Sequence, residues 1–502
     1  MMRKQLQIAV ALLTIAGGIA NGDELGTMNA AGVAIDGAAG TPPRGIGYPT
    51  TRISPDAIVD IVDLGAAQRR VPVSPAGEPR DQRPIAGFVE QTPAGLLAAP
   101  NWSPVSTGGH TWSVEYSAPD AFALRLRLSG DFGRDGLEVR VYDPVSGNAF
   151  GPYTAPRLDS RGDWWTTIIF GSTIGLEFHV PADGAFPPRM PDLTGVARYE
   201  SPPGGIAGME CTHLDYSCQG AWQDDGRAVC MLAFIDGDGD VVGYCSGALL
   251  NRSPSDLAPL VLTANHCITD QNDANATSFV WFYQTDSCNG TPPDPNDLPR
   301  SDGSILLKVR YNADTDLVGL YEPPAGDFWL GWDSGGWALQ SDAFGIAHPA
   351  GSFKRMSFGD VTVALWVTYG LNSAHVWRVY WDSGATEGGS SGSPVLDSSH
   401  RVRGALKGGA DCDYGDYGRF GVAYETLEPY INNMPSPVFV QSGAGGDQTG
   451  TSGNPFNTVY EGTHCVFAGD EIRIRAGNYN EQFRLWRPMR LNSDGGLVRI
   501  GQ

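Results

Sequence analysis

Residues 386–396 read TEGGSSGSPVL and combine serines with closely spaced glycines. A serine hydroxyl is a poor nucleophile near neutral pH. It reacts only beside a general base and with donors held ready for the negative oxygen that forms on a substrate. The glycines allow the backbone to turn so that the amides of Gly389 and Ser391 point to one spot. Taken alone, a Gly/Ser run is more often a plain connecting loop, so the role of Ser391 depends on the segments upstream.

A histidine segment lies upstream, where residues 262–267 read LTANHC. His266 follows an apolar strand end and precedes Cys267, and a second cysteine, Cys245, opens the neighbouring strand-like segment. A bond between the two cysteines could fix the turn that carries His266, and such rigidity is what a general base needs. A lone histidine in this setting is otherwise a core residue.

An acidic segment lies between the other two, where residues 314–320 read DTDLVGL. An acid just ahead of an apolar strand can sit beneath an imidazole, accept its N–H and stabilise the imidazolium. Asp314 or Asp316 could serve. An exposed aspartate at a strand end is the simpler alternative for each.

The composition limits the class of protein. A chain of 502 residues suggests two to four domains, and 66 Gly, 36 Pro and 18% charged residues indicate turn-rich β structure. The net charge of −22 argues against nucleic acid as a partner, because phosphate binding needs clustered Lys and Arg. The acidity fits an extracellular protein or one that meets basic substrates, although simple solubility is the more common cause.

The N-terminus predicts export. Residues 1–20 have a basic start, an apolar run over 6–16 and small residues after it, as in a signal peptide. The run is too short to span a bilayer, so we expect a secreted, extracellular protein without a membrane anchor, whose eight cysteines form disulfides by default. Residues 21–84 are rich in Gly, Pro, Ala and Asp and predict a poorly ordered pro-segment.

Residues 85–182 predict a β-sandwich that forms an accessory domain or pro-domain. Apolar residues alternate with others such as Arg125 and Arg127, which places one face of each strand on a core and the other in water. Trp164 and Trp165 could stack on a sugar but are more often core residues. Residues 183–209, rich in Pro and Gly, predict a linker in which Arg198 is an exposed candidate for proteolytic cleavage.

The three segments, in the order His, Asp, Ser, resemble chymotrypsin-like serine proteases. TANHC is similar to that family's TAAHC, Asp314 matches the acid of its DxxLLxL strand start, and residues 389–394 match GDSGGP with departures at Ser390 and Ser393. Secreted bacterial lysyl endopeptidases carry TExGSSGSP, which resembles residues 386–394 throughout. Four further motifs resemble that branch, namely FWLGWD (328–333), IAHP (346–349), LKGG (406–409) and YGR (417–419).

The resemblance covers about residues 211–432 and implies a chymotrypsin-like double β-barrel over 210–434, with protein or peptide substrates and neither cofactor nor metal. It implies that Ser391 is the nucleophile, His266 the general base and Asp314 the residue that orients it, with the amides of Gly389 and Ser391 as the oxyanion hole. It also implies three disulfides, which would join Cys211 to Cys412, Cys218 to Cys288 and Cys245 to Cys267. Cys230 and Cys465 have no counterpart and could pair with each other or stay free.

The resemblance leaves substrate specificity open. The pocket floor of chymotrypsin-like enzymes lies six positions before the nucleophile, here at Ala385. Lysyl endopeptidases instead carry an aspartate two residues before the tyrosine of YGR, which is Gly415 here. Asp413 and Asp416 flank that position, so cleavage after Lys or Arg is expected if one of them reaches the pocket. The alternative is a solvated acidic turn, and Lys407, beside the pocket residue Gly408, could repel a basic substrate.

Residues 236–240 and the C-terminal segment carry weaker signals of function. Residues 236–240 read DGDGD, but Val241 and Gly247 occupy positions where a calcium loop needs a glycine and an acid, so we expect a hairpin turn and no metal. Residues 435–502 resemble the first coils of pectin-lyase-like right-handed β-helices. This partial β-helix-like segment would either dock on the protease or continue in a longer chain, and contact with a surface or carbohydrate is one possible role.

Two other classes of function stay open. A catalytically inactive protease homologue that acts in extracellular binding or adhesion would keep the fold but lose a triad residue, and all three are present. A carbohydrate-binding protein would leave the histidine and aspartate segments unexplained.

Overall fold

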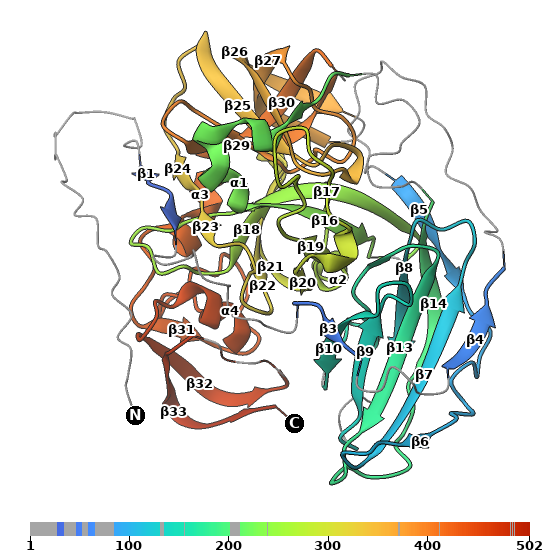
Figure 1. The fold of residues 1–502 in the computed structure, drawn as a ribbon. Helices are drawn as coiled ribbons and strands as arrows, with labels where there is room; N and C mark the ends of the chain where they lie inside the picture. The colour runs from blue at the N-terminus through green and yellow to red at the C-terminus, as the bar shows by residue number, and fades with distance from the viewer. Residues whose placement is uncertain are drawn as a thin grey trace, which may run out of the picture.

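The structure is a computed structural model that describes residues 28–34, 47–52, 59–65, 85–130, 135–154, 156–200, 211–237, 239–369, 372–410, 412–481, 483, 485 and 487–501. The expected signal peptide and most of the expected pro-segment lie outside these residues. The chain is mainly β, and Figure 1 shows an N-terminal sandwich, a central two-barrel part and a small C-terminal sheet.

The N-terminal part has two packed sheets, as the alternating sequence predicts. The first contains β3 (Thr50–Thr51), β4 (Val59–Asp63), β6 (Ser103–Pro104), β7 (His110–Ser117), β9 (Glu138–Tyr142), β10 (Asn148–Tyr153) and β13 (Thr173–Val180). The second begins with β5 (Ile85–Gln91), β8 (Ala123–Ser129), β11 (Asp163–Trp165), β12 (Ile169–Phe170) and β14 (Asp192–Tyr199). Leu124, Leu126 and Leu128 of β8 face the core between the sheets, and both Trp164 and Trp165 are buried.

The other face of β8 does not lie in water, contrary to the expectation from the sequence. Arg125 is fully buried, and its guanidinium donates to the carbonyl of Thr166 and to those of Ala233 and Ala276 in the central part. The reason is that the second sheet continues into the first barrel, where β5 pairs antiparallel with β17. The sandwich and the barrel therefore share one sheet.

The expected linker is also partly wrong, because residues 192–199 form the buried strand β14 between β5 and β8. Leu193 and Val196 face the core of the sandwich, with a β-bulge between them, and Ala197 and Tyr199 belong to a second apolar cluster. Burial of both faces prevails over the Pro/Gly-rich flanks. Arg198 is only 3% exposed and pairs with Glu90 at 2.9 Å. It is therefore not the exposed cleavage candidate that the sequence suggested.

The central part consists of two barrels. The first contains β16 (Val229–Ile235), β17 (Val241–Leu249), β18 (Leu260–Thr263), β19 (Ser278–Val280), β20 (Arg300–Asp302), β21 (Ser304–Arg310) and β22 (Thr315–Leu320). The second contains β15 (Leu214–Asp215), β24 (Gly331–Asp333), β25 (Ser341–Ala347), β26 (Arg355–Tyr369), β27 (Asn372–Ser383), β28 (Pro394–Leu396), β29 (Arg401–Ala410) and β30 (Tyr414–Arg419). Short helices lie in the connections between these strands along the chain: η1 (Tyr216–Cys218), η2 (Gly220–Trp222), α1 (Gln223–Arg227), α2 (Gln271–Asn275), η3 (Pro295–Asp297), η4 (Tyr311–Ala313) and η5 (Pro349–Gly351).

The described residues of the expected pro-segment add strands to the central part and to the sandwich. β1 (Asn29–Ala30) pairs with β24, and β2 (Val33–Ala34) pairs with β23 (Phe328–Trp329) of the central part. β3 and β4 instead join the sandwich, on β10 and β7.

The C-terminal segment docks on the central part. Helix α3 (Phe420–Ile431) leads to a parallel sheet of β31 (Val438–Val440), β32 (Glu471–Tyr479) and β33 (Arg490–Ile500), with α4 (Val459–Cys465) packed beside it. Its core residues belong to the same apolar cluster as those of the first barrel. Arg252 of the central part donates to the carbonyls of His464, Cys465 and Val466. The likeness to a β-helix stays a prediction.

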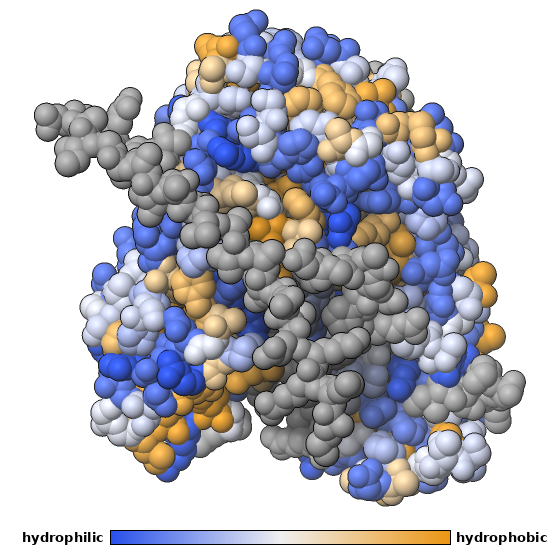
Figure 2. Space-filling model, turned by 60° about the vertical axis from the view of Figure 1, so that its left-hand side comes forward, coloured by the Kyte–Doolittle hydropathy of each residue, from blue (hydrophilic) through white to orange (hydrophobic). Residues whose placement is uncertain are grey.

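The surface agrees with the acidic, polar composition. Figure 2 shows one face on which hydrophilic side chains predominate and apolar areas are small and scattered. Within the described residues, no helix is both long and apolar enough to cross a membrane.

Candidate active site

The serine loop and the histidine turn meet between the two barrels. A disulfide joins Cys245 on β17 to Cys267 in the turn after β18. The carbonyl oxygen of Ser391 accepts from the amide of Ser246 at 2.7 Å and lies 3.8 Å from the sulfur of Cys267. Because His266 precedes Cys267, the disulfide holds the histidine turn against the backbone of Ser391.

His266 is fixed by Asp314. The Nδ1 atom of His266 lies 2.7 Å from Oδ2 of Asp314, and the backbone amide of His266 donates to Oδ1 at 3.1 Å. Both side chains are buried. Asp314 ends helix η4 in a left-handed conformation, with φ of 46°, which turns the chain into β22. When Nδ1–H donates to this carboxylate, the imidazole presents the lone pair of Nε2 as the base.

Asp316 has a different partner. Its carboxyl group accepts from the side-chain amide of Asn265 at 3.2 Å and 3.3 Å. Burial raises the pKa of Asp316 well above its ordinary value, because a buried carboxylate loses its hydration. The structure thus brings Asp314, and not Asp316, to His266.

Gly389 allows a backbone conformation and a close backbone contact that a larger residue would not allow. Gly389 has φ of +97°, and a Cβ atom there would lie 2.7 Å from the backbone nitrogen of Ala350. The carbonyl of Gly388 accepts from that nitrogen, and the carbonyl of Gly389 accepts from Ser246 Oγ at 3.0 Å. Among the described residues, the amides of Gly389 and Ser391 donate no backbone hydrogen bond. Both amides can therefore bind a substrate oxygen.

His348, within the IAHP motif, supports this loop and was not foreseen as part of the site. Its amide donates to Ser246 Oγ, whose hydroxyl in turn donates to Gly389, and its Nδ1 atom lies 2.8 Å from the carbonyl of Ser352. Burial lowers the pKa of His348 to about 3, so its ring is neutral near pH 7. The IAHP motif was the only signal for this residue in the sequence.

Lys407 makes a second contact to the carboxylate of Asp314. Its side chain is fully buried, and Nζ lies 3.7 Å from Oδ2 of Asp314. The sequence suggested that Lys407 repels basic substrates. The structure gives it a charged partner in the site itself.

The four expected pocket residues lie in different environments. Ala385 is buried, and Gly408 pairs with Asp416 across β29 and β30. Asp413 is exposed in the turn before β30, so it fits the solvated alternative. The carboxylate of Asp416 is fully buried and does not point freely into a pocket, because Arg378 donates to both of its oxygens at 2.8 Å.

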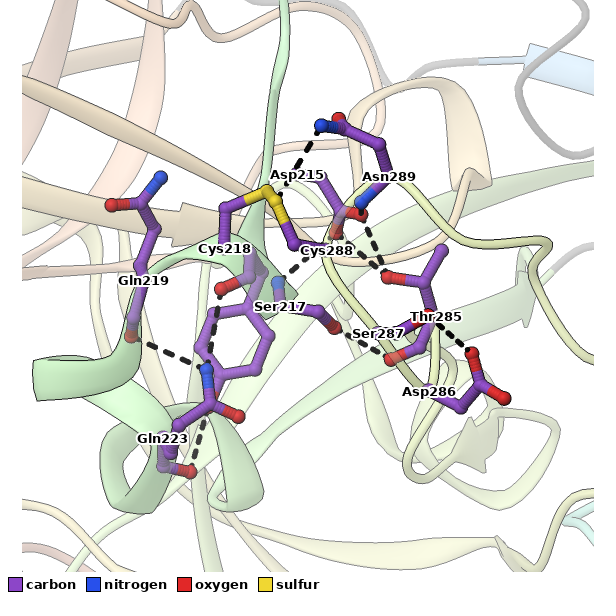
Figure 3. Close-up of a disulfide and its surroundings, with 11 residues drawn as sticks. Asp215, Ser217, Cys218, Gln219, Gln223, Thr285, Asp286, Ser287, Cys288 and Asn289 are labelled. Carbon is purple, nitrogen blue, oxygen red and sulfur yellow. Dashed lines mark hydrogen bonds between the residues drawn. A yellow bond between two sulfur atoms is a disulfide. The ribbon is translucent and has the colours of Figure 1, made fainter.

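The structure contains three disulfides, which join Cys211 to Cys412, Cys218 to Cys288 and Cys245 to Cys267. These are the pairs that the resemblance implies, and Cys230 and Cys465 are both free and buried. Figure 3 shows the surroundings of the second disulfide, where the carboxylate of Asp215 accepts from Thr285 Oγ1 and from the amides of Ser217 and Asn289. Asp215 thereby links, by hydrogen bonds, the same two segments that the disulfide joins.

The acidic DGDGD segment forms a turn between β16 and β17. Asp236 Oδ1 accepts from the amides of Asp240 and Val241, so this carboxylate caps the turn itself. Asp238 lies outside the described residues. Where the structure describes the chain, no three His, Cys, Asp or Glu side chains group as metal ligands.

The two barrels, with a histidine, an aspartate and a serine between them, define the chymotrypsin-like β-barrel fold. The sequence model described as lysyl endopeptidase, C-terminal domain, matches residues 208–418, and that of the lysyl endopeptidase N-terminal domain matches residues 83–187. The lysyl endopeptidase of Pseudomonas aeruginosa is 30% identical over 364 residues, which are 68% of this chain and 78% of that protein. The chain belongs to the lysyl endopeptidase family and is a protease.

Two other similarities are more distant. The secreted RxLR effector protein 73 of Plasmopara viticola is 30% identical over 174 residues, 32% of this chain and 40% of that protein. The active form of a protease from M. tuberculosis has 14% identity and a TM-score of 0.31 over 43% of this chain and 87% of its own.

Proposed function

We propose that the protein is an exported serine endopeptidase that hydrolyses peptide bonds through Ser391, His266 and Asp314. Ser391 Oγ attacks the scissile carbonyl while His266 Nε2 takes its proton, and His266 then returns that proton to the leaving amine. Asp314 orients the imidazole and stabilises its cation. The amides of Gly389 and Ser391 hold the oxyanion. Water then releases the acyl group from Ser391 by the same steps.

The observation that carries this proposal is the buried contact of 2.7 Å between His266 Nδ1 and Asp314 Oδ2, beside the disulfide that holds Ser391. A structural histidine would not require an acid on one nitrogen and a serine loop next to its turn. The resemblance leaves cleavage after Lys or Arg open, and the specificity needs its own test, because Asp413 is exposed and Asp416 is bound by Arg378.

The test is Ser391→Ala, which removes the nucleophile and should lower turnover on peptides and esters together by roughly 10⁶. Ser398→Ala, in an exposed turn of the same barrel, is the matched control and should keep wild-type turnover. Hydrolysis by purified Ser391→Ala at the wild-type rate would refute the assignment.

A fluorophosphonate probe separates this enzyme from an inactive homologue. Ser391 Oγ bonds to phosphorus, fluoride leaves, and His266 accepts the hydroxyl proton. We expect one label per chain, located at Ser391 by peptide mass mapping. Absence of the label in the mature protein would support a binding role.

A further inference from the structure

The residues that face the expected specificity pocket are uncharged. A Cβ atom at Gly415 would lie 2.8 Å from Tyr417 Cε2, 3.0 Å from Leu406 Cδ1 and 3.4 Å from Thr386 Oγ1. Thr386 follows Ala385, and the backbone of Leu406 bonds to Gly392 and Ser393, which directly follow Ser391. The face of β29 and β30 next to Ser391 therefore presents apolar and hydroxyl groups.

The nearest buried carboxylate lies on the opposite face of the same strands. Successive residues of a strand point to opposite faces, so Asp416 points away from Gly415 and Tyr417. Arg378 donates to both oxygens of Asp416, and the hydroxyl of Tyr369 donates to one of them. Turning Asp416 toward a substrate would break these bonds and leave Arg378 without its carboxylate, which is costly for a partly buried cation.

The other charges nearby do not favour a cation either. Lys407, which follows Leu406, points to the opposite face and lies against Asp314. Glu387, next to Thr386, is 3.0 Å from His213 Nε2. Asp413 is exposed in the turn before β30. Within the described residues, the carboxylates flanking the pocket are therefore either engaged by a partner or solvated.

Resting on the proposed function, we infer that this protease prefers an uncharged, apolar side chain before the cut, and that Ala385, Leu406, Gly415 and Tyr417 set this preference. A lysine or arginine side chain would lose water in the pocket without gaining a carboxylate partner. An apolar side chain would instead bury its surface against Leu406 and Tyr417.

The experiment measures kcat/KM on quenched peptides that differ only at the residue before the cut, which is Lys, Arg, Leu, Met or Phe. We expect the best apolar peptide to exceed the Lys and Arg peptides by about tenfold or more. A preference for Lys or Arg would overturn the inference, and loss of that preference in Asp413→Asn would then identify the missing carboxylate. Labelling of Ser391 by the fluorophosphonate is measured on the same sample. Lys preference with labelling contradicts only this inference, whereas the lack of both cleavage and labelling contradicts the proposed function.

Substitutions in the pocket give a second test with matched controls. Ala385→Asp and Gly415→Asp place a carboxylate there, and Ala385→Asn and Gly415→Asn have nearly the same shape without the charge. We expect the Lys/Leu ratio of kcat/KM to rise at least tenfold in one Asp variant and not in its Asn control. The site at 385 is included because a side chain at 415 must displace Tyr417 and Leu406. An unchanged ratio in both Asp variants, with labelling of Ser391 retained, would overturn the pocket assignment.

Discussion

At the scale of single residues, two aspartates that are two positions apart take different roles. Asp314 binds the histidine, whereas Asp316 accepts from Asn265, and burial raises its pKa. The local sequence left both candidates open, and the likeness to a family motif selected Asp314. In the structure, the carboxylate of Asp314 contacts His266, and its catalytic role stays a prediction.

This difference predicts the outcome of a matched pair of substitutions. Asp314→Asn removes the acceptor that fixes the imidazole tautomer, so kcat/KM should fall by about 10⁴. Asp316→Asn keeps the shape of a side chain that bonds to Asn265 and not to His266, so kcat/KM should change less than tenfold. Peptide hydrolysis by the two purified variants, with circular dichroism as a check on folding, measures both. Equal losses would contradict the assignment of Asp314.

Other residues of the site could not be predicted, because their partners are distant in the sequence. Short motifs identified His266, Asp314 and Ser391, since each motif combines a reactive side chain with the turn that presents it. Arg378 lies 38 residues from Asp416, and no local pattern relates the two. Only the pairing of β27 with β30 brings them together.

At the scale of elements, local alternation predicted strands well but not their neighbours. Strand β8 was expected from its leucines, yet the burial of Arg125 depends on a barrel more than a hundred residues further along the chain. The strand β14 was missed because Pro and Gly dominate its flanks. The C-terminal segment left docking and continuation open, and the structure shows docking.

Docking of helix α4 should depend on pH. His464 is fully buried, with Nε2 3.0 Å from the carbonyl of Leu320 and Nδ1 3.1 Å from that of Tyr460. Burial lowers the pKa of His464 to about 4 from 6.5, although both carbonyls favour the protonated ring. The undocked chain therefore binds the proton more readily. The contribution of His464 to the free energy of docking is fully present above pH 6.5, and up to about 3 kcal/mol of it is lost as the pH falls toward 4.

Hydrogen exchange of the α4 amides between pH 7 and pH 4, corrected for intrinsic rates, measures this effect. Exchange should accelerate as the pH falls. His464→Gln keeps a hydrogen-bonding side chain that does not titrate, so its exchange should vary less over this interval. The same pH dependence in wild type and His464→Gln would show that another group is responsible.

At the scale of the whole molecule, the sandwich and the first barrel form one structural unit. They share a sheet through β5 and β17, and an apolar cluster draws Ala86, Val89 and Tyr199 from one side and Met231 and Tyr244 from the other. The sequence predicted two domains and a linker, because composition reports the change between segments but not the contacts across it.

This shared core predicts that both parts unfold together. Calorimetry of the full chain should show one transition for the sandwich and the first barrel, and two separate transitions would contradict the shared unit. Arg125→Met removes donors to three buried carbonyls and should lower the temperature of that transition. Arg161→Met, at an exposed ion pair of the sandwich, should leave it nearly unchanged.

The two free cysteines lie in different parts of the molecule. Cys230 is on β16 in the first barrel, and Cys465 ends helix α4 against the carbonyl of Pro429. Burial raises the pKa of both thiols, that of Cys465 to about 12, so neither carries reactive thiolate while it stays covered. A thiol reagent can therefore modify each cysteine only when its surroundings open. The modification rate of Cys230 reports the opening of the first barrel, and that of Cys465 reports the release of the C-terminal helix.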